Sequence, residues 1–594
     1  MNKSWINILN SDMKRKNLFV LILIVITLQI IKNLYSSEKL TFESILDQEL
    51  LTGNINKIES IAYQFLAVYK PEQLPDIYKD VVPVFTRNTT ALKAKVVKMW
   101  PQLSTDQKGI FSQYLTRPLE AKLQLSITSP SGLFKIHYTS EGSDAATDEF
   151  ITQVANVFDY VYDFEVNVLK YLPPPVDDPA NPEYDIYVHN IGDYGATTPE
   201  NPVPGTSRDD YTSWIEIDND FQHTPTKGLP ALQVTAAHEF FHMIQLGYRT
   251  FQNTIINSVF LFESCAAWME DVVYDDVNDY YNYLPSFFKT QDKHFHIVNG
   301  THEYGLAIFH NMLEKKFGRD IIKLIWNEFI DHEPFEAIDK ALIAHSSNFT
   351  TELAEFAIWN YFTGTRADTV KFYPEGQFYP ELVEKENYEV NNTLSFTSQT
   401  NQLGFNYYKI TTNTSGNYVI QPTFPDPQNW IYSLIIESFE GETSYTYCGG
   451  NSSKNLSDIR SLTDIILTPI YAKIPTSNSY TNNIDFTIKI ERGSTTEQVN
   501  KIISIIPNPF ILLEHKKSEI LFNLAEQNND VYISIFTEHG KQINRIRLGK
   551  RPDGLNTFEW DGTNSNGEIV VSGVYLFLIE ANEIIGPGKI AVIR

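Results

Sequence analysis

The hydrophobic pattern changes near residue 385, and no other feature of the sequence constrains the fold as strongly. Before this point the longest apolar segments have helical spacing. After it, short alternating segments such as YSLIIESF and IDFTIKIER lie among Asn, Thr, Ser and Tyr. Spacings of three and four residues are typical of amphipathic helices, whereas alternation is typical of strands with one buried face. We therefore expect helix-rich and all-β parts within one chain.

The length of the chain requires several domains. A single hydrophobic core rarely grows beyond about 250 to 300 residues, so 594 residues predict three or four domains. The hydrophobic content of 42% is high enough for most of the chain to be globular. The formal net charge of -26 argues against nucleic acid as a partner, because a polyanion would be repelled.

The amino terminus has the pattern of a secretory signal. Basic residues at 14–16 precede an apolar run, Leu18 to Ile31, and the polar stretch from Asn33 to Glu38 follows. The apolar run is shorter than the roughly 20 residues that cross a bilayer, which favours a cleaved signal over a permanent membrane span. We expect a signal peptide at residues 1–37 and a secreted or cell-surface protein.

The remaining chain divides into four predicted regions. Residues 38–128 have helical spacing and form either a pro-segment or a helical cap on the next domain. Residues 129–385 combine short strands with long helices, which indicates an α+β domain. Residues 386–498 and 499–594 predict two all-β sandwich modules.

The segment His238-Glu239-Phe240-Phe241-His242 carries the clearest chemistry. Two histidines four residues apart on a helix are offset by only about 40°, so both imidazoles can reach one ion. The apolar residues between Ala231 and Gln245 would hold such a helix inside a core. This pattern predicts a metal centre with Glu239 directed towards the same cleft.

Zinc is the expected cofactor, because a catalytic zinc site has three protein ligands and one open position for water. Glu263, in the helical segment FLFESCAAWMED, is the expected third ligand. Glu270 lies two turns further along the same face and is the rival ligand, or else an acceptor that orients a ligand imidazole. Glu239 would act as the general base that removes a proton from the water.

Three further predictions concern the surroundings of this centre. Tyr304, or else His302, would donate a hydrogen bond to the developing oxyanion. The strand from Trp214 to Asp218 would be an edge strand that binds extended peptide through its main chain. Cys265 and Cys448 could form a bridge, although a buried and inert thiol at Cys265 is favoured.

Four segments together resemble the gluzincin-like secreted bacterial metalloproteases typified by a myxobacterial family. They are FKIHYTSEG, AAHEFFHMIQLGY, FESCAAWMEDVVYDD and EYGLAIFHNMLEKKFG, within residues 130–335. The resemblance implies a zincin-like fold, with His238, His242 and Glu263 as zinc ligands and Glu239 as the catalyst. Gluzincins of the thermolysin type have Asp four residues after the ligand Glu, where this chain has Ala267.

The last module resembles a different group of proteins. The segments IIPNPF, FEWDGTNSNGEIVVSGVYLFLIEA and GKIAVIR are similar to the FlgD-like immunoglobulin fold and to the type A carboxy-terminal sorting domains of the type IX secretion system. This resemblance implies export across an outer membrane, with the secretion machinery as a partner.

The expected function is that of a secreted zinc endopeptidase with a protein or peptide substrate. Two alternatives remain open at this stage. One is a cell-surface adhesin or binding protein in which the metal site is vestigial, because two β-modules make up over a third of the chain. The other is a non-peptidase zinc hydrolase, because zinc and a glutamate also activate water towards other carbonyl substrates.

Overall fold

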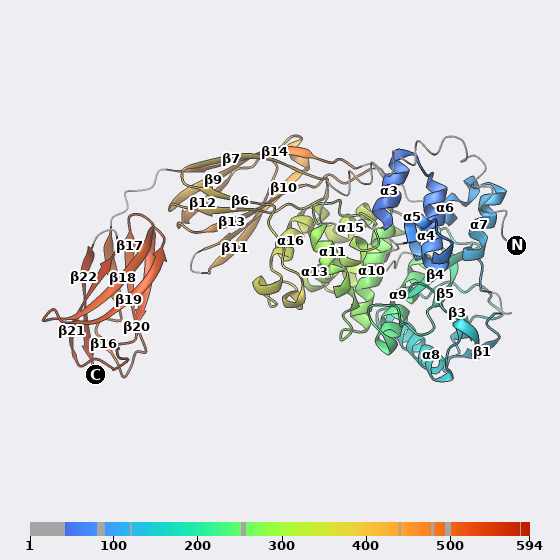
Figure 1. Cartoon of the computed structure of the whole chain (residues 1–594), viewed down its shortest axis with the longest axis horizontal. Coiled ribbons are helices and arrows are strands. Elements are labelled where there is room, and N and C mark those ends of the chain that lie inside the picture. The colour runs from blue at the N-terminus through green and yellow to red at the C-terminus, as the bar shows by residue number, and fades with distance from the viewer. Residues whose placement is uncertain are drawn as a thin grey trace. The chain divides into compact units, whose positions relative to one another are not determined.

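The computed structural model describes residues 42–79, 89–118, 122–250, 257–438, 441–476, 480–493, 500–581 and 584–594. The predicted signal at residues 1–37 lies outside these ranges. The chain divides into two compact units, Met1–Thr86 and Arg87–Arg594, and each is described by itself. The protein is multidomain, with a helical amino-terminal region and several β-sheet modules in its carboxy-terminal half (Figure 1).

The described part of the first unit is helical. Its helices are α3 (Phe42–Thr52), α4 (Lys57–Tyr69) and α5 (Asp76–Lys79). Helix α4 begins at a capping box, because the Asn56 side chain accepts the N–H groups of Ile58 and Glu59. A small apolar cluster that includes Phe42 and Tyr78 holds the helices together.

The second unit begins with two helices and a mixed five-stranded sheet. The helices are α6 (Thr89–Met99) and α7 (Thr105–Leu115), and the strands are β1 (Leu125–Thr128), β2 (Phe134–Tyr138), β3 (Tyr184–Val188), β4 (Gly195–Pro202) and β5 (Tyr211–Ile217). The strand order is β1-β2-β3-β5-β4. Strands β2, β3 and β5 are parallel, and β1 and β4 run antiparallel to their neighbours.

The predicted edge strand from Trp214 to Asp218 is wrong. Its residues belong mainly to β5, which lies between β3 and β4, and the edge of the sheet is β4 instead. Pro199 and Pro202 weaken the strand pattern of β4 in the sequence. Proline cannot donate to a ladder and is therefore confined to edge strands and bulges, which agrees with this position.

Helices pack on the sheet and extend the domain. They are α8 (Asp148–Tyr162), a π-helical turn (Asp163–Val168), α9 (Gly228–Tyr248), α10 (Val259–Val273), α11 (Leu284–Lys289), α12 (His302–Gly305), α13 (Ala307–Phe317), α14 (Asp320–Phe329), α15 (Pro334–Ile343) and α16 (Phe349–Tyr361). Almost every side chain of α9 from Ala231 onward is buried, and α10 packs against it. A helix that is apolar all round belongs inside a core, so polar side chains on α9 lie in the interior.

The next module is a β-sandwich. Its strands are β6 (Glu386–Val390), β7 (Thr393–Thr400), β8 (Tyr408–Thr412), β9 (Gly416–Thr423), β10 (Trp430–Glu437), β11 (Thr443–Gly449), β12 (Lys454–Ile459), β13 (Asp464–Tyr471) and β14 (Ile484–Arg492). They form two sheets, β11-β10-β13-β8-β6 and β12-β9-β14-β7, around one shared apolar core.

The last module has its own core. Its strands are β15 (Lys501–Ile506), β16 (Phe510–Ile511), β17 (Ser518–Leu524), β18 (Asn528–Thr537), β19 (Gln542–Arg551), β20 (Gly554–Trp560), β21 (Gly573–Glu580) and β22 (Ile584–Ile593). They form the sheets β15-β17-β20 and β16-β22-β21-β18-β19.

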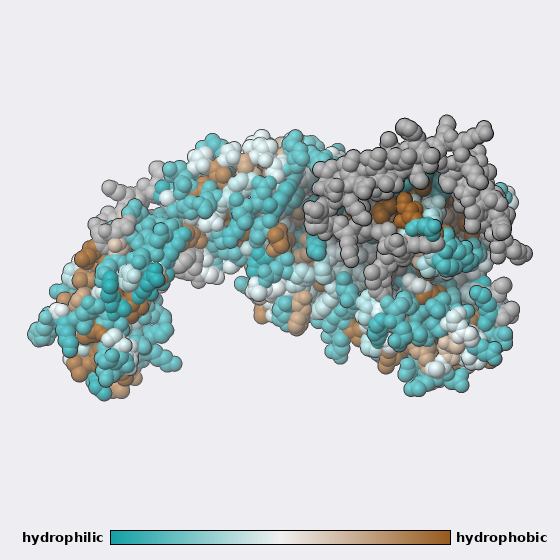
Figure 2. All heavy atoms as spheres, viewed as in Figure 1, coloured by the Kyte–Doolittle hydropathy of each residue, from teal (hydrophilic) through white to brown (hydrophobic). Residues whose placement is uncertain are grey.

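The visible surface of the described chain is mainly hydrophilic, with apolar side chains in scattered groups (Figure 2). Within the described ranges, none of the helices combines the length and the apolar character that a membrane crossing needs.

Candidate metal centre

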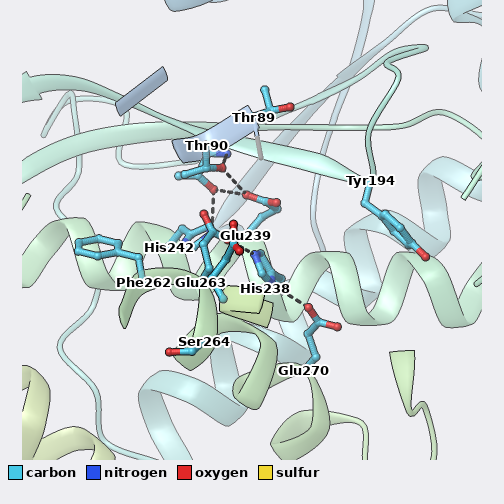
Figure 3. Close-up of polar contacts among 12 residues, drawn as sticks. Thr89, Thr90, Tyr194, His238, Glu239, His242, Phe262, Glu263, Ser264 and Glu270 are labelled. Carbon is cyan, nitrogen blue, oxygen red and sulfur yellow. Dashed lines mark hydrogen bonds and ion pairs between the residues drawn. The ribbon is translucent and has the colours of Figure 1, made fainter. Parts of the chain in front are cut away.

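Three side chains from two neighbouring helices converge on one point. His238 and His242 lie on α9 and Glu263 lies on α10, and their ligand atoms are all within 4.8 Å of one another (Figure 3). The Nε2 atom of His238 is 3.2 Å from Oε2 of Glu263, and the Nε2 atom of His242 is 3.4 Å from the same oxygen. The structure thus brings the three predicted ligands together.

The spacing of these atoms fits a zinc ion. Zinc bonds of about 2.0 to 2.2 Å at the tetrahedral angle place neighbouring ligand atoms about 3.3 to 3.6 Å apart. The two observed separations, 3.2 and 3.4 Å, are close to that value. In addition, the Nε2 atom of His242 is buried, and among the described residues no group lies in hydrogen-bonding geometry with it, although Oε2 of Glu263 is 3.4 Å away. A buried nitrogen without a partner is costly, and a metal bond would satisfy it.

The other nitrogen of each imidazole has its own acceptor. The Nδ1 atom of His238 lies 2.7 Å from Oε1 of Glu270, and that of His242 lies 2.6 Å from Oε1 of Gln245. The Gln245 side chain is itself anchored, because its Nε2 donates to the main-chain oxygen of Phe262. Such partners keep the proton on Nδ1 and direct the Nε2 lone pair towards the centre. Glu270 therefore occupies the orienting position and not the ligand position.

Burial and charge act against each other in this cluster. Burial lowers the pKa of His238, but the hydrogen bonds to Glu263 and Glu270 outweigh it and raise that pKa to about 10. Burial raises the pKa of Glu263, but His242 and His238 outweigh it and lower that pKa to about 2. Positive charge is thus strongly favoured beside Glu263, as a cation site requires.

Glu239 is held beside the three ligands by strand β4. The Thr197 hydroxyl lies 2.8 Å from Oε2 of Glu239 and 2.9 Å from its main-chain oxygen. The Thr90 hydroxyl of α6 lies 3.5 Å from the same Oε2 (Figure 3). At Gly195 a Cβ atom would come within 2.9 Å of Glu239, so only glycine lets β4 approach α9 this closely.

Tyr304 lies next to the cluster, whereas His302 does not join it. The rings of Tyr304 and His238 are stacked with centroids 5.8 Å apart, and the Tyr304 hydroxyl is buried without a hydrogen-bond partner. Burial and the nearby Glu263 raise the pKa of Tyr304. His302 packs against Phe287, and its Nδ1 lies 3.0 Å from the Thr290 hydroxyl. The tyrosine is therefore the better placed of the two predicted donors.

Both cysteines are free thiols. Cys265 is buried on α10, with its sulfur 3.4 Å from Nε2 of His310, while Cys448 lies on β11. The bridge between them that the sequence left open does not form.

The sequence analysis missed three residues that shape this centre: Gln245, Thr197 and Gly195. Gln245 follows His242 by three residues, which places both on one face of a helix, so the spacing could have revealed it. Thr197 and Gly195 carry no such signal, because they reach Glu239 from the separate strand β4.

Two parts of the chain match known sequence families. Residues 141–425 match a family described as a family of unknown function, DUF6055, and residues 512–583 match the FlgD Ig-like domain. The last module therefore has the fold that its motifs predict. The first match includes His238, His242 and Glu263 but names no activity. No curated protein matches this chain.

Several solved structures are similar to small parts of the chain. FlgD from P. aeruginosa is 22% identical over 16% of this chain and 64% of its own, with a TM-score of 0.12. PorZ of the Porphyromonas gingivalis type-IX secretion system is 17% identical over 18% and 14%, with a TM-score of 0.12. Dimeric latent PorU from the same organism is 18% identical over 35% and 19%, with a TM-score of 0.14. The chain thus spans less than two thirds of each of these proteins.

Proposed function

We propose that this chain is a zinc-dependent endopeptidase that acts outside the cell. One observation carries the proposal: two Nε2 atoms and one carboxylate oxygen converge at tetrahedral spacing, while each Nδ1 has a buried acceptor. His238, His242 and Glu263 would hold the zinc. Bound there, zinc would supply Lewis acidity and lower the pKa of a water molecule in its open position.

Glu239 is the proposed general base. Its carboxylate lies beside the ligand set and is oriented by the Thr197 hydroxyl, so it can take a proton from water and pass it to the leaving amine. Tyr304 is the proposed donor to the oxygen of the scissile carbonyl. Among the described residues its buried hydroxyl has no hydrogen-bond partner, so its proton is available to the substrate oxygen.

The position of β4 favours a peptide over other carbonyl substrates. This strand is the edge of the sheet, and its residue Thr197 contacts Glu239. An edge strand recognises an extended peptide through a series of main-chain hydrogen bonds, which a small ester or amide cannot form.

For the last module we propose the role of an export signal that the type IX secretion machinery recognises, which agrees with its FlgD-like sequence match.

The decisive experiment compares metal content and peptide cleavage in two charge-matched variants. We expect purified protein to contain zinc near one equivalent and to cleave a proteome-derived peptide mixture. Glu239→Gln should retain the zinc and lower cleavage by a factor of about 10² to 10⁴, because it removes only the base. Glu149→Gln, an exposed position on α8, removes the same charge and should leave both properties unchanged.

Other outcomes would favour the alternatives. Zinc without cleavage that depends on Glu239 would indicate a surface binding protein with a vestigial site. Hydrolysis of esters or small amides, but not of peptides, would indicate a non-peptidase hydrolase. Protein without zinc, even after incubation with the ion, would contradict the proposed centre.

A further inference from the structure

The candidate centre is closed to solvent. His238, Glu239, His242 and Glu263 are each at most 5% exposed. A peptidase must admit a polymer to the open position of its metal, so a closed centre turns over peptides only when it opens transiently, and turnover by the intact chain should be low. Another part of the chain must therefore cover the candidate centre.

Helix α6 lies on β4 next to Glu239 (Figure 3). The Thr90 hydroxyl accepts a hydrogen bond from the main-chain N–H of Thr197 at 3.0 Å and lies 3.5 Å from Oε2 of Glu239. A hydroxyl has one donor and two acceptor sites, so Thr90 can serve both groups at once. The N–H of Thr197 points away from β5, at the edge where an extended substrate would pair.

Two further side chains fasten α6 at the same place. The Lys93 ammonium is fully buried, lies 2.6 Å from Oε1 of Glu216 and donates to the Thr198 hydroxyl at 2.8 Å. The Thr89 hydroxyl donates to Oδ2 of Asp193 at 2.6 Å. These polar contacts add to the apolar packing of α6, whose side chains Leu92 and Val96 are also buried.

The helical conformation of α6 prevents it from binding β4 as a substrate would. Thr90 stands in the first turn of α6, where main-chain N–H groups have no partner within the helix, but its helical backbone cannot add to a sheet edge as an extended strand. Helix α6 can therefore cover the edge of β4 without presenting a bond for cleavage.

We infer that α6 is an internal inhibitor that occupies the substrate edge of β4 and blocks Glu239 until the chain is cut behind it. This inference rests on the proposed peptidase function, because it assigns a regulation to that same site. While the chain is intact, the helix is tethered and its effective concentration at β4 is high. A cut between α6 and α7 removes the tether, and the segment then dissociates according to its own affinity.

The test uses the full chain with a recognition sequence for an orthogonal site-specific protease between Pro101 and Gln102, which are both exposed. A cut there leaves Arg117 and its ion pairs to Asp185 and Glu200 on the enzyme side. The fragment that carries α6 then has no covalent link to the rest of the domain. Two readouts are measured before and after cutting: peptide turnover, and hydrogen exchange of the β4 amides.

We expect cutting to raise peptide turnover at least tenfold and to speed exchange in β4 at least tenfold. In the uncut chain, Thr90→Arg should have the same effects, because its side chain cannot fit at this buried position. The matched control is Thr105→Arg, at an exposed position on α7, and should change neither readout. Thermal denaturation of both variants checks that the remaining fold is intact.

The two proposals fail in different ways. Unchanged exchange in β4 after complete cutting would overturn the inhibitor, whatever the turnover, because exchange does not depend on metal or catalysis. Faster exchange with zinc bound but without peptide turnover would support the covering role of α6 and contradict the peptidase function. Measurable turnover that is equal in cut and uncut chains would also overturn the inhibitor.

Discussion

The two ring nitrogens of each candidate ligand histidine make different contacts. The Nε2 atoms face the centre, and the Nδ1 atoms bond to Glu270 and Gln245. Glu263 and Glu270 lie on similar faces of α10, but their side chains make different contacts. Glu263 lies among the ligand atoms, whereas Glu270 contacts the far side of the His238 imidazole.

This separation predicts two different losses of zinc affinity. Glu263→Ala should abolish stoichiometric binding, because it removes a ligand. Glu270→Ala should lower affinity by about 10 to 100-fold, because it releases the orientation of His238. Glu270→Gln keeps an acceptor for Nδ1 and should restore part of the loss. Competition with a chromogenic chelator measures all three, and equal losses in the two alanine variants would identify Glu270 as a ligand.

At the scale of elements, the close approach of β4 to α9 positions Glu239, the proposed base. The approach is possible because position 195 has no side chain, and Thr197 then reaches Glu239 two residues further along the strand. The same strand carries the edge that α6 covers. The position of β4 therefore determines both the orientation of Glu239 and, in the proposed mechanism, the access of a substrate to it.

A pair of glycine substitutions tests this arrangement. Gly195→Ala should lower the free energy of unfolding by about 1 to 3 kcal/mol, because the new Cβ would lie 2.9 Å from side-chain atoms of Glu239 and Thr235. Gly109→Ala, where a Cβ meets nothing within 4 Å on helix α7, should instead stabilise by up to about 1 kcal/mol. Thermal or denaturant unfolding gives both values. A neutral Gly195→Ala would show that β4 can move away from α9.

At the scale of the whole molecule, the β-modules have hydrophobic cores that are separate from the candidate metal centre. The sandwich and the last module each have an apolar cluster of their own, apart from the helices that carry the candidate ligands. Domains with separate cores can unfold separately. Damage to one core should therefore leave the chemistry of another intact.

Phe577→Ala provides a direct test of this separation. Phe577 is fully buried in the last module, so its truncation should lower the free energy of unfolding of that module by about 3 to 5 kcal/mol. Zinc content and peptide turnover should remain unchanged. Calorimetry should show one shifted transition, and loss of zinc in this variant would mean that the modules are energetically coupled.

The sequence by itself determined the local features. The histidine pair on an apolar helix and the alternation after residue 385 follow from the periods of helices and strands, which span only a few neighbouring residues. The FlgD-like module was also predictable, because its turn and strand motifs are contiguous, and the family match agrees.

Only the tertiary structure decided which side chains meet across the chain. Glu263 and Glu270 are seven residues apart and differ by only about 20° around a helix, so spacing could not distinguish them. The edge position of β4 depends on which strands pair, and proline had hidden this strand in the sequence. Thr90 and Glu239 are separated by 149 positions, and only folding brings their side chains together. Contacts of this kind depend on packing between elements, which no local pattern encodes.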